Sequence, residues 1–277
     1  MADTYIYRTP TETGEPTKWT YCGWFKRTNV GVRQNIVYAT TVADGGASIY
    51  VEIQHEATGN LVFQVRIGGV HGVKRTNRLF RDEGAWYHFL FNFDSTLAEG
   101  TDRMQIWVNG VRETSFETDT HPAVDDEVSP GILDWLNRIG GGWPGAGPFY
   151  WQGCMSHVHF CDGYVYDSSS FGEFDATSGI WKIKTSPSVT YGTNGYFLKM
   201  EDRANLDLDS GTNAFTMATG GTLTATYDNP SNSFAVMNGL DSFYQAATFT
   251  QGNLTITTGT PNMAYNTGTM GMSAGLW

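Results

Sequence analysis

The sequence predicts an all-β protein whose strands form a sandwich of two sheets. Short runs in which apolar and polar residues alternate recur between clusters of Gly, Asn, Asp and Pro, which is typical of half-buried strands. Of 277 residues, 16% are charged and 14% aromatic, a composition that excludes a coiled coil and a disordered polyelectrolyte. The length fits one large domain, or one domain and a smaller piece.

Two strands give the clearest inward and outward faces. In residues 18–27 one parity is aromatic and is expected to face the core (Trp19, Tyr21, Gly23, Phe25). Residues 87–94 repeat this pattern with Tyr87, Phe89, Phe91 and Phe93. The opposite parity is expected to face outward, with Leu90 as an exception. Both strands are predicted to lie in the same sheet.

The remaining elements follow from turn and alternation signals. Asn109-Gly110 follows the alternating residues Met104, Ile106 and Val108, which predicts a two-residue type I′ hairpin. One short helix is expected to open near Asp167, with a serine of 168–170 as its N-cap, and to end by Gly172. Further strands are expected near 35–42, 47–55, 60–67, 135–140, 149–161 and 195–201.

The composition changes after Arg203. Residues 204–277 contain no Lys, Arg, Glu or His and are rich in Thr, Gly and Asn, so we divide the chain into a domain of residues 1–203 and an extension of residues 204–277. The extension is either a β layer against the first domain or the start of a second β domain. The sequence stops on the apolar pair Leu276-Trp277, so continuation of the natural chain past Trp277 stays an open alternative.

Charge and cysteine content narrow the function classes. The chain has 17 Lys and Arg against 28 Asp and Glu, a net charge of −11 that opposes binding to nucleic acid or anionic lipid. No apolar run reaches the length of a membrane span, and the first residues lack a secretory pattern. We therefore expect no insertion into a membrane. The chain is expected to be made in the cytoplasm, unless it is already processed. The three cysteines, Cys22, Cys154 and Cys161, are expected to be buried thiols.

Several stretches resemble a known group when taken together and in order. They are Trp19–Arg27, Phe80–His88, Ile106–Val111, Gly153–Gly163, Asp167–Asp175, Gly179–Trp181 and Tyr191–Gly195. They resemble the concanavalin A-like lectin/glucanase (laminin-G-like) domain in virion proteins of tailed bacteriophages, over roughly residues 5 to 201. The resemblance implies a two-sheet antiparallel jelly roll and a place on a phage particle. The C-terminal β-rich extension is expected from the composition of residues 204–277.

No catalytic or metal site is expected. Glu173 and Asp175 only partly match the Glu-x-Asp-x-x-Glu strand of related β-glucanases, because the third carboxylate is missing. His157, His159 and Cys161 alternate on one strand but lack a fourth zinc ligand. Asp207 and Asp209 resemble the start of a calcium-binding loop, but the later carboxylate of such a loop is absent from this chain. We therefore expect no cofactor and no enzyme.

Glycan binding has the best support from residue chemistry. Sugar rings stack on aromatic rings, and their hydroxyl groups need polar partners. The outward parity supplies both kinds of side chain in five candidates, Trp24, His88, Asn92, Gln105 and Trp107. The alternative is that these rings pack under loops or against another subunit.

The function that we expect is that of a non-enzymatic virion protein, as a head decoration, fibre or tail appendage. Its expected partners are other virion proteins, copies of itself and a host-surface glycan, because repeated copies turn weak contacts into avidity. The extension after Arg203 is expected to be the assembly element. Two alternatives stay open: a carbohydrate-binding protein outside a virion and a glycoside hydrolase.

Overall fold

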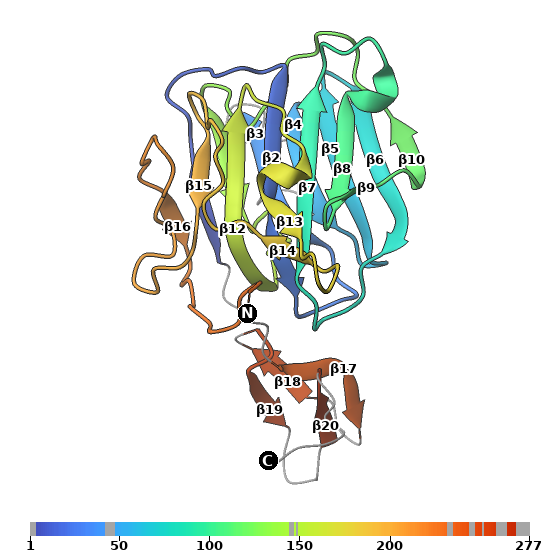
Figure 1. Ribbon diagram of the computed structural model, residues 1–277, viewed down its shortest axis with the longest axis vertical. Coiled ribbons are helices and arrows are strands. Elements are labelled where there is room, and N and C mark those ends of the chain that lie inside the picture. Colours follow the sequence, from blue (N-terminus) through green and yellow to red (C-terminus); the bar gives the residue numbers. More distant parts are fainter. Residues whose placement is uncertain are drawn as a thin grey trace.

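The computed structural model describes residues 4–41, 48–143, 147, 149–231, 235–243, 247–250, 252–258 and 265–269. It contains an eight-stranded and a six-stranded antiparallel sheet that face one another (Figure 1). In spatial order the larger sheet runs β10 (Phe116–Thr120), β6 (Val70–Leu79), β5 (Asn60–Ile67), β4 (Tyr50–His55), β3 (Gln34–Thr41), β11 (Trp135–Ile139), β1 (Tyr5–Arg8) and β16 (Ala218–Gly220). The smaller runs β15 (Tyr196–Leu198), β12 (Gly153–Asp162), β2 (Lys18–Arg27), β7 (Tyr87–Asp94), β8 (Met104–Val108) and β9 (Val111–Arg112). The predicted all-β sandwich is confirmed.

Aromatic side chains fill the space between the two sheets. β2 and β7 pair in the expected register, with Trp19 opposite Phe93 and Tyr21 opposite Phe91. The Trp19 ring stacks on Phe93 with centroids 5.5 Å apart and meets Phe63 of the other sheet edge-on at the same distance. The predicted core parity is therefore correct in both strands, because alternation places successive side chains on opposite faces.

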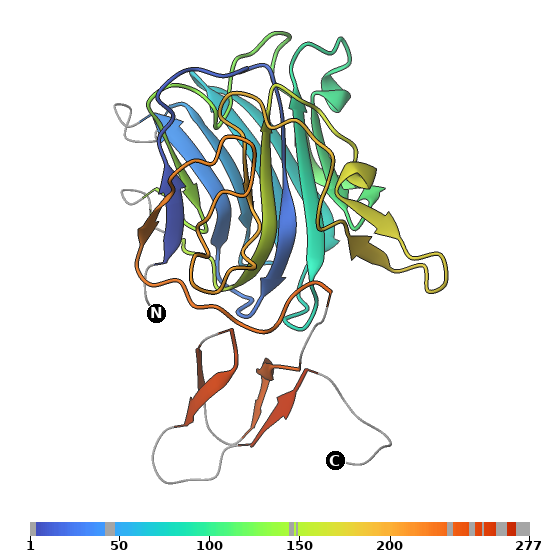
Figure 2. The same ribbon diagram turned by 60° about the vertical axis from the view of Figure 1, so that its left-hand side comes forward.

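The outer face of the six-stranded sheet is covered instead of open. Residues 164–191, the covering segment, contain a 3-10 turn, η3 (Ser168–Ser170), and a hairpin of β13 (Gly172–Phe174) and β14 (Trp181–Ile183). Figure 2 shows this hairpin, in yellow, standing on the outside of the sheet. A second apolar cluster lies beneath the segment and contains Cys22, Leu90, Cys161, Phe171, Tyr191 and Phe197. Leu90 breaks the polar pattern of its strand face because it packs in this cluster.

Most predicted elements lie where the sequence places them. Asn109 and Gly110 have φ values of 47° and 83° between the paired residues Val108 and Val111, which confirms the two-residue hairpin. The short helix is η3, but its cap is Asp167, whose carboxylate accepts from the Ser169 N–H at 2.8 Å. Strands β1, β6 and β10 were not predicted. Two ends of predicted strands, residues 42 and 47, lie outside the described residues.

The chain stays on the sandwich after residue 203. β16 pairs with β1 as the outermost strand of the larger sheet, and Asp228 is buried against β2. Two small sheets follow, β17 (Met237–Phe243) with β20 (Tyr265–Gly268), and β18 (Ala247–Thr250) with β19 (Thr255–Thr258). Both views show them below the sandwich (Figures 1 and 2).

A buried carboxylate fastens these small sheets to the sandwich. Glu83 is 4% exposed, and its Oε2 accepts from the Gly239 N–H at 2.9 Å and from the Asn253 side-chain amide at 3.4 Å. Its Oε1 accepts from the Val30 N–H at 3.3 Å. Burial raises the pKa of the Glu83 carboxyl, which these hydrogen bonds partly oppose. Within the described ranges, no helix is long and apolar enough to cross a membrane.

Candidate functional site

The five residues predicted to bind glycan share one sheet face, but most of them are not accessible. Trp24, His88 and Asn92 are buried, with exposed fractions of 4%, 1% and 4%. The Asn92 amide donates to the Tyr166 carbonyl of the covering segment at 2.9 Å. The expected outward exposure is therefore wrong for these three. The covering segment contacts Asn92 through Tyr166 and His88 through Trp181, and the Trp24 ring packs on His88. Gln105 and Trp107 are half-buried, and the Trp107 indole N–H donates to Gln105 at 3.2 Å.

The alternation of His157, His159 and Cys161 is broken by a β-bulge. The register of β12 against β2 shifts between Ser156 and His159, and His157 has a φ of 50°. His159 packs under the covering segment and shares a 3.0 Å hydrogen bond with the Tyr191 hydroxyl. In the part of the chain that the structure describes, no three His, Cys, Asp or Glu side chains are grouped as a metal site.

The cysteines are free thiols, two of them fully buried. Cys22 and Cys161 are 0% exposed, whereas Cys154 is partly exposed, so the expectation of burial is wrong for Cys154. Burial raises the pKa of all three thiols, of Cys154 to about 11. They are poor nucleophiles, because the thiolate is the reactive form.

The acidic pairs singled out in the sequence make local bonds. Glu173 and Asp175 both approach the Lys182 ammonium, at 3.3 and 3.4 Å. Hydrogen bonds from Ser178 lower the pKa of Asp175 to about 2, so this carboxylate stays ionised. Asp209 accepts from the N–H groups of Phe197 and Phe215, each at 2.9 Å, and fixes the chain after β15. Both arrangements are typical of turn structure.

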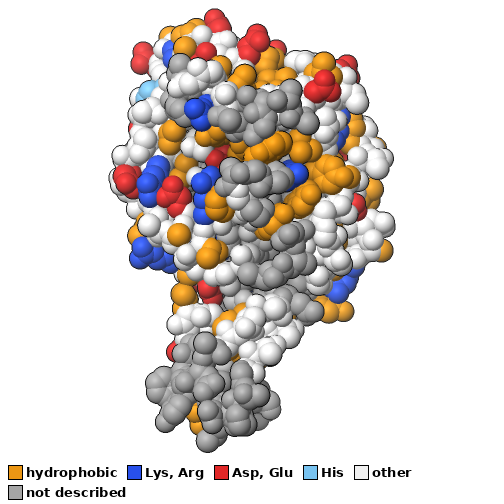
Figure 3. All heavy atoms as spheres, turned by 180° about the vertical axis from the view of Figure 1, so that it is seen from behind, with side chains coloured by type: hydrophobic (Ala, Val, Ile, Leu, Met, Phe, Trp, Pro, Cys, Tyr) orange, Lys and Arg blue, Asp and Glu red, His pale blue; other side chains and the backbone are white. Residues whose placement is uncertain are grey.

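The outer face of the eight-stranded sheet carries aromatic side chains that contact one another. Figure 3 looks onto this face and shows hydrophobic side chains in its middle. Tyr38 and Tyr50 stack with centroids 5.5 Å apart, as do Tyr5 and Tyr150 at 5.8 Å, and the Arg138 guanidinium lies 4.8 Å from the Tyr5 ring. The aromatic groups of this face thus contact one another in pairs.

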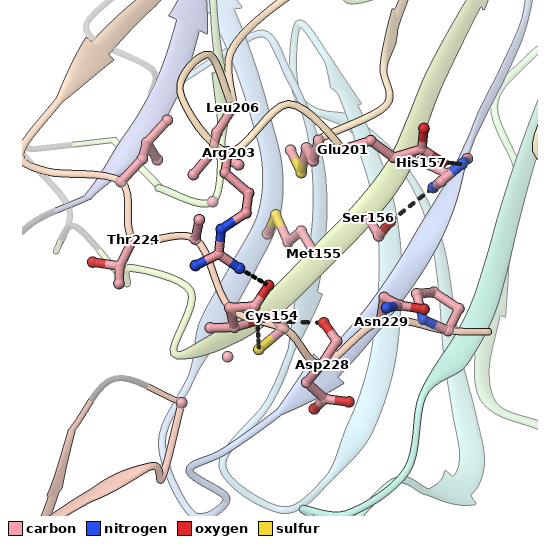
Figure 4. Close-up of a pocket in the computed structure, with 18 of the residues that line it drawn as sticks. Cys154, Met155, Ser156, His157, Glu201, Arg203, Leu206, Thr224, Asp228 and Asn229 are labelled. Carbon is pink, nitrogen blue, oxygen red and sulfur yellow. Dashed lines mark hydrogen bonds and ion pairs between the residues drawn. The ribbon is translucent and has the colours of Figure 1, made fainter. Parts of the chain in front are cut away.

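A groove of about 620 Å³ lies beside the start of β12. We call it the C-terminal groove, since its walls include residues 222–231 as well as the first residues of β1 and β12 (Figure 4). The same walls include Met200, Glu201, Arg203 and Leu206. Its apolar side chains include Met155, Met200 and Leu223, which pack against the sandwich core. A groove of this size that mixes apolar surface with a few polar groups is typical of a small-ligand site.

Two buried polar atoms at the groove have no hydrogen-bond partner in the described structure. They are the indole Nε1 of Trp151 and the Nε2 of His157. His157 is 5% exposed; its Nδ1 is 2.8 Å from the Ser156 hydroxyl, and its Nε2 lies 3.5 Å from the Glu201 carboxylate without hydrogen-bond geometry. Burial lowers the pKa of His157 to about 4, so its ring is neutral at pH 7.

A buried ion pair holds one wall of the groove. The Lys26 ammonium of β2 lies 2.7 Å from the Asp228 carboxylate, and their side chains are 0% and 2% exposed. The Trp86 indole N–H donates to the other oxygen of Asp228 at 3.1 Å. These two contacts attach the segment around Asp228 to the six-stranded sheet.

The rim of the groove carries an arginine and an exposed tyrosine. The Arg203 guanidinium donates to the Thr226 carbonyl at 3.3 Å and lies 4.0 Å from the centre of the Tyr227 ring. Tyr227 remains 74% exposed, and Figure 4 shows the Arg203 side chain turned into the groove.

Sequence reasoning did not find this rim. Arg203 is the last cation before the change in composition, and the sequence suggested only that it ends the first domain. The sequence did contain one signal: Arg203 is a cation directly before a long segment that has no Lys or Arg.

The family comparison identifies the sandwich. The family model described as the concanavalin A-like lectin/glucanases superfamily matches residues 2–165, more than half of the chain. A search of curated proteins finds no match.

Solved structures show similar folds at low sequence identity. A protein from Bacteroides ovatus to which carbohydrate binding is ascribed is 16% identical with a TM-score of 0.51, and the match covers 83% of this chain and 59% of that one. A heptameric SAP-like pentraxin from Limulus polyphemus is 15% identical (TM-score 0.41; 58% of this chain, 71% of that one). Domains LG4-5 of the mouse laminin α1 chain are 12% identical (TM-score 0.42; 70% and 44%). Taken with the family match, the two facing sheets show that this chain belongs to the concanavalin A-like lectin/glucanase superfamily.

Proposed function

We propose that this chain is a glycan-binding module and that the C-terminal groove holds the glycan. The observation that carries the proposal is the groove itself, a concave site of about 620 Å³ at the edge of a lectin-like sandwich. The family match supports carbohydrate binding as the class of function. The groove supports this particular location, because the predicted outward face is mostly covered.

The lining of the groove offers what a sugar needs. The exposed Tyr227 ring can carry the C–H face of a sugar ring, and the side chains of Thr224 and Asn229 lie exposed beside it. The exposed Arg203 guanidinium at the rim can donate to a hydroxyl group.

A glycan array with the purified chain tests the proposal. Saturable binding is expected, and Tyr227→Ala should weaken it by about tenfold or more, since an aromatic contact and its buried area are lost. Tyr164→Ala is the matched control, because Tyr164 is exposed outside the groove. Binding that is lost in Trp107→Ala and kept in Tyr227→Ala would move the site to the originally predicted face. No saturable signal from any glycan would refute the function.

We also propose that the module binds without catalysis. Glu173 and Asp175 lie on an exposed hairpin and share one lysine, whereas glycoside hydrolysis needs two carboxyl groups on opposite sides of the scissile bond. Incubation with polysaccharides that bind should release no reducing sugar. Turnover that follows saturation kinetics would contradict this proposal.

The virion setting is a proposal of its own, supported by the phage resemblance of the sequence. One structural feature favours assembly: in the two small C-terminal sheets, the exposed fractions of Leu240, Leu254 and Tyr265 are above one half. Two-stranded sheets are marginal alone, so packing against virion partners or further copies would stabilise them. Mass spectrometry of purified particles would detect the chain if it is a virion protein. Its absence from particles and its recovery from the host cytoplasm would favour a free carbohydrate-binding protein.

A further inference from the structure

We infer that the C-terminal groove selects glycans that carry a carboxylate and that Arg203 is the residue that determines this specificity. The inference rests on the proposed function and adds a ligand class to it. It follows from the charges that the described residues bring to the groove and from the way in which Arg203 is held.

The groove has a cation that no carboxylate of the described structure neutralises. Its charged lining side chains among the described residues are Glu201, Arg203 and Asp228. Asp228 is paired with the buried Lys26 at 2.7 Å, and Glu201 lies 2.7 Å from the ammonium of Lys199.

Arg203 has no ion pair with any carboxylate in the ranges that the structure describes. His157 adds no charge at pH 7, since burial lowers its pKa to about 4. Lys26 and Lys199, which lie outside the lining, balance the two carboxylates and leave the positive charge of Arg203, although the whole chain carries −11. An anionic group of the ligand would compensate this cation, and a cationic ligand would be repelled.

Two contacts hold Arg203 in place for this role. One N–H group donates to the Thr226 carbonyl, and the guanidinium plane is kept near the Tyr227 ring, 4.0 Å from its centre. A guanidinium has five donors in a rigid fork, so the others are available for a carboxylate. A carboxylate accepts two parallel hydrogen bonds from this fork, and its oxygens are stronger acceptors than those of the much less basic sulfate ester.

The same rim places the charge beside a stacking surface. Arg203 contacts one face of the Tyr227 ring, and the 74% exposure of Tyr227 leaves ring surface for a sugar, whose acidic substituent can extend past the edge of the ring to the arginine. The acidic substituent and the ring of one sugar residue can therefore be bound together. We accordingly assign an acidic monosaccharide unit to the rim and the neutral remainder of the glycan to the groove.

A paired glycan array tests this inference. Each probe is printed in an acidic form and as its carboxyl-reduced neutral counterpart, with oligogalacturonide and sialyllactose as two of the acidic probes and a sulfated lactose as a third type of anion. The acidic form should bind at least about tenfold more tightly, the order expected for charge-assisted hydrogen bonds, and less tightly at high salt. Arg203→Gln should remove this preference, so that the acidic and neutral forms bind with equal affinity, whereas Arg203→Lys should restore part of it.

The outcomes separate the inference from the proposed function. Arg81→Gln is the matched control, because Arg81 is also exposed and also donates to a backbone carbonyl, away from the groove. Equal binding of acidic and neutral forms, a preference that survives Arg203→Gln, or a preference for the sulfated probe would overturn the inference while glycan binding stands. A lack of binding to every form would refute both. Circular dichroism and the urea midpoint of each variant show whether its fold is kept.

Discussion

The buried pair of Lys26 and Asp228 gives the sharpest prediction about stability. Replacing Asp228 with Asn keeps an oxygen that can accept from the Trp86 indole but removes the charge that lies 2.7 Å from the Lys26 ammonium. At an effective dielectric constant of about 20, two unit charges at this distance attract by about 6 kcal/mol. Relaxation and water entry offset part of this loss, so Asp228→Asn should cost about 3–5 kcal/mol of unfolding free energy.

Urea denaturation measures this cost as a lower midpoint at an unchanged slope. The double variant Lys26→Met/Asp228→Asn removes both charges and should recover most of the loss, because the penalty comes from leaving one charge buried without Asp228. Lys18→Met is the surface control: Lys18 lies 4.0 Å from Asp94 with 41% of its side chain exposed, and its loss should cost less than about 1 kcal/mol.

The reasoning about this pair would be refuted by two results. One is a cost for Asp228→Asn no larger than that of the surface control. The other is a double variant as unstable as the single one. A drop in slope together with the midpoint would instead show that the segment around Asp228 unfolds separately from the sandwich.

The remaining predictions concern pH, thiols and one turn. Burial lowers the pKa of His157 to about 4, so below a pH of about 6.5 the folded state binds fewer protons than the unfolded state. The free energy of unfolding should therefore fall as the pH drops from about 6.5 to 4. His157→Gln should make the urea midpoint depend less on pH over this range. Cys22 and Cys161 should resist iodoacetamide at pH 8 in the folded protein and react in urea, as mass spectrometry would show; native labelling of either would contradict their burial. Gly110→Ala should cost more than about 1 kcal/mol in urea melts, since φ is 83° and a Cβ would lie 2.4 Å from the Trp181 ring; an unchanged midpoint would show that this contact gives way freely.

The sandwich could be predicted from the sequence because local patterns encode it. Alternating aromatic residues in 18–27 and 87–94 identify both the strands and the core faces, and Asn109-Gly110 identifies the hairpin. β6 could not be recognised, since polar residues occupy its core-facing parity: Lys74 lies on that face, where its ammonium contacts Asp119 and the Phe116 ring. The alternation rule fails in β6 because the buried Lys74 pairs with Asp119 of β10.

The candidate site could not be predicted, because it is made by segments far apart in the chain. The alternation in β2 and β7 identifies the sheet face that points away from the core. It does not show whether another segment packs on that face, and here residues 164–191 do so. The bulge at His157 likewise turns that side chain away from the expected position and toward the groove.

The sequence by itself determined most of the strands and the aromatic core, because alternation and turn signals depend on residues a few positions apart. It also determined the family resemblance, which depends on short stretches in a fixed order. Only the tertiary structure decided which surface is accessible. It buried three of the five predicted sugar contacts, and it brought Tyr227 and Arg203 to the mouth of a groove that starts at β12. The physical reason is that burial and charge compensation depend on which distant segments meet, as Lys26 and Asp228 do across about two hundred residues.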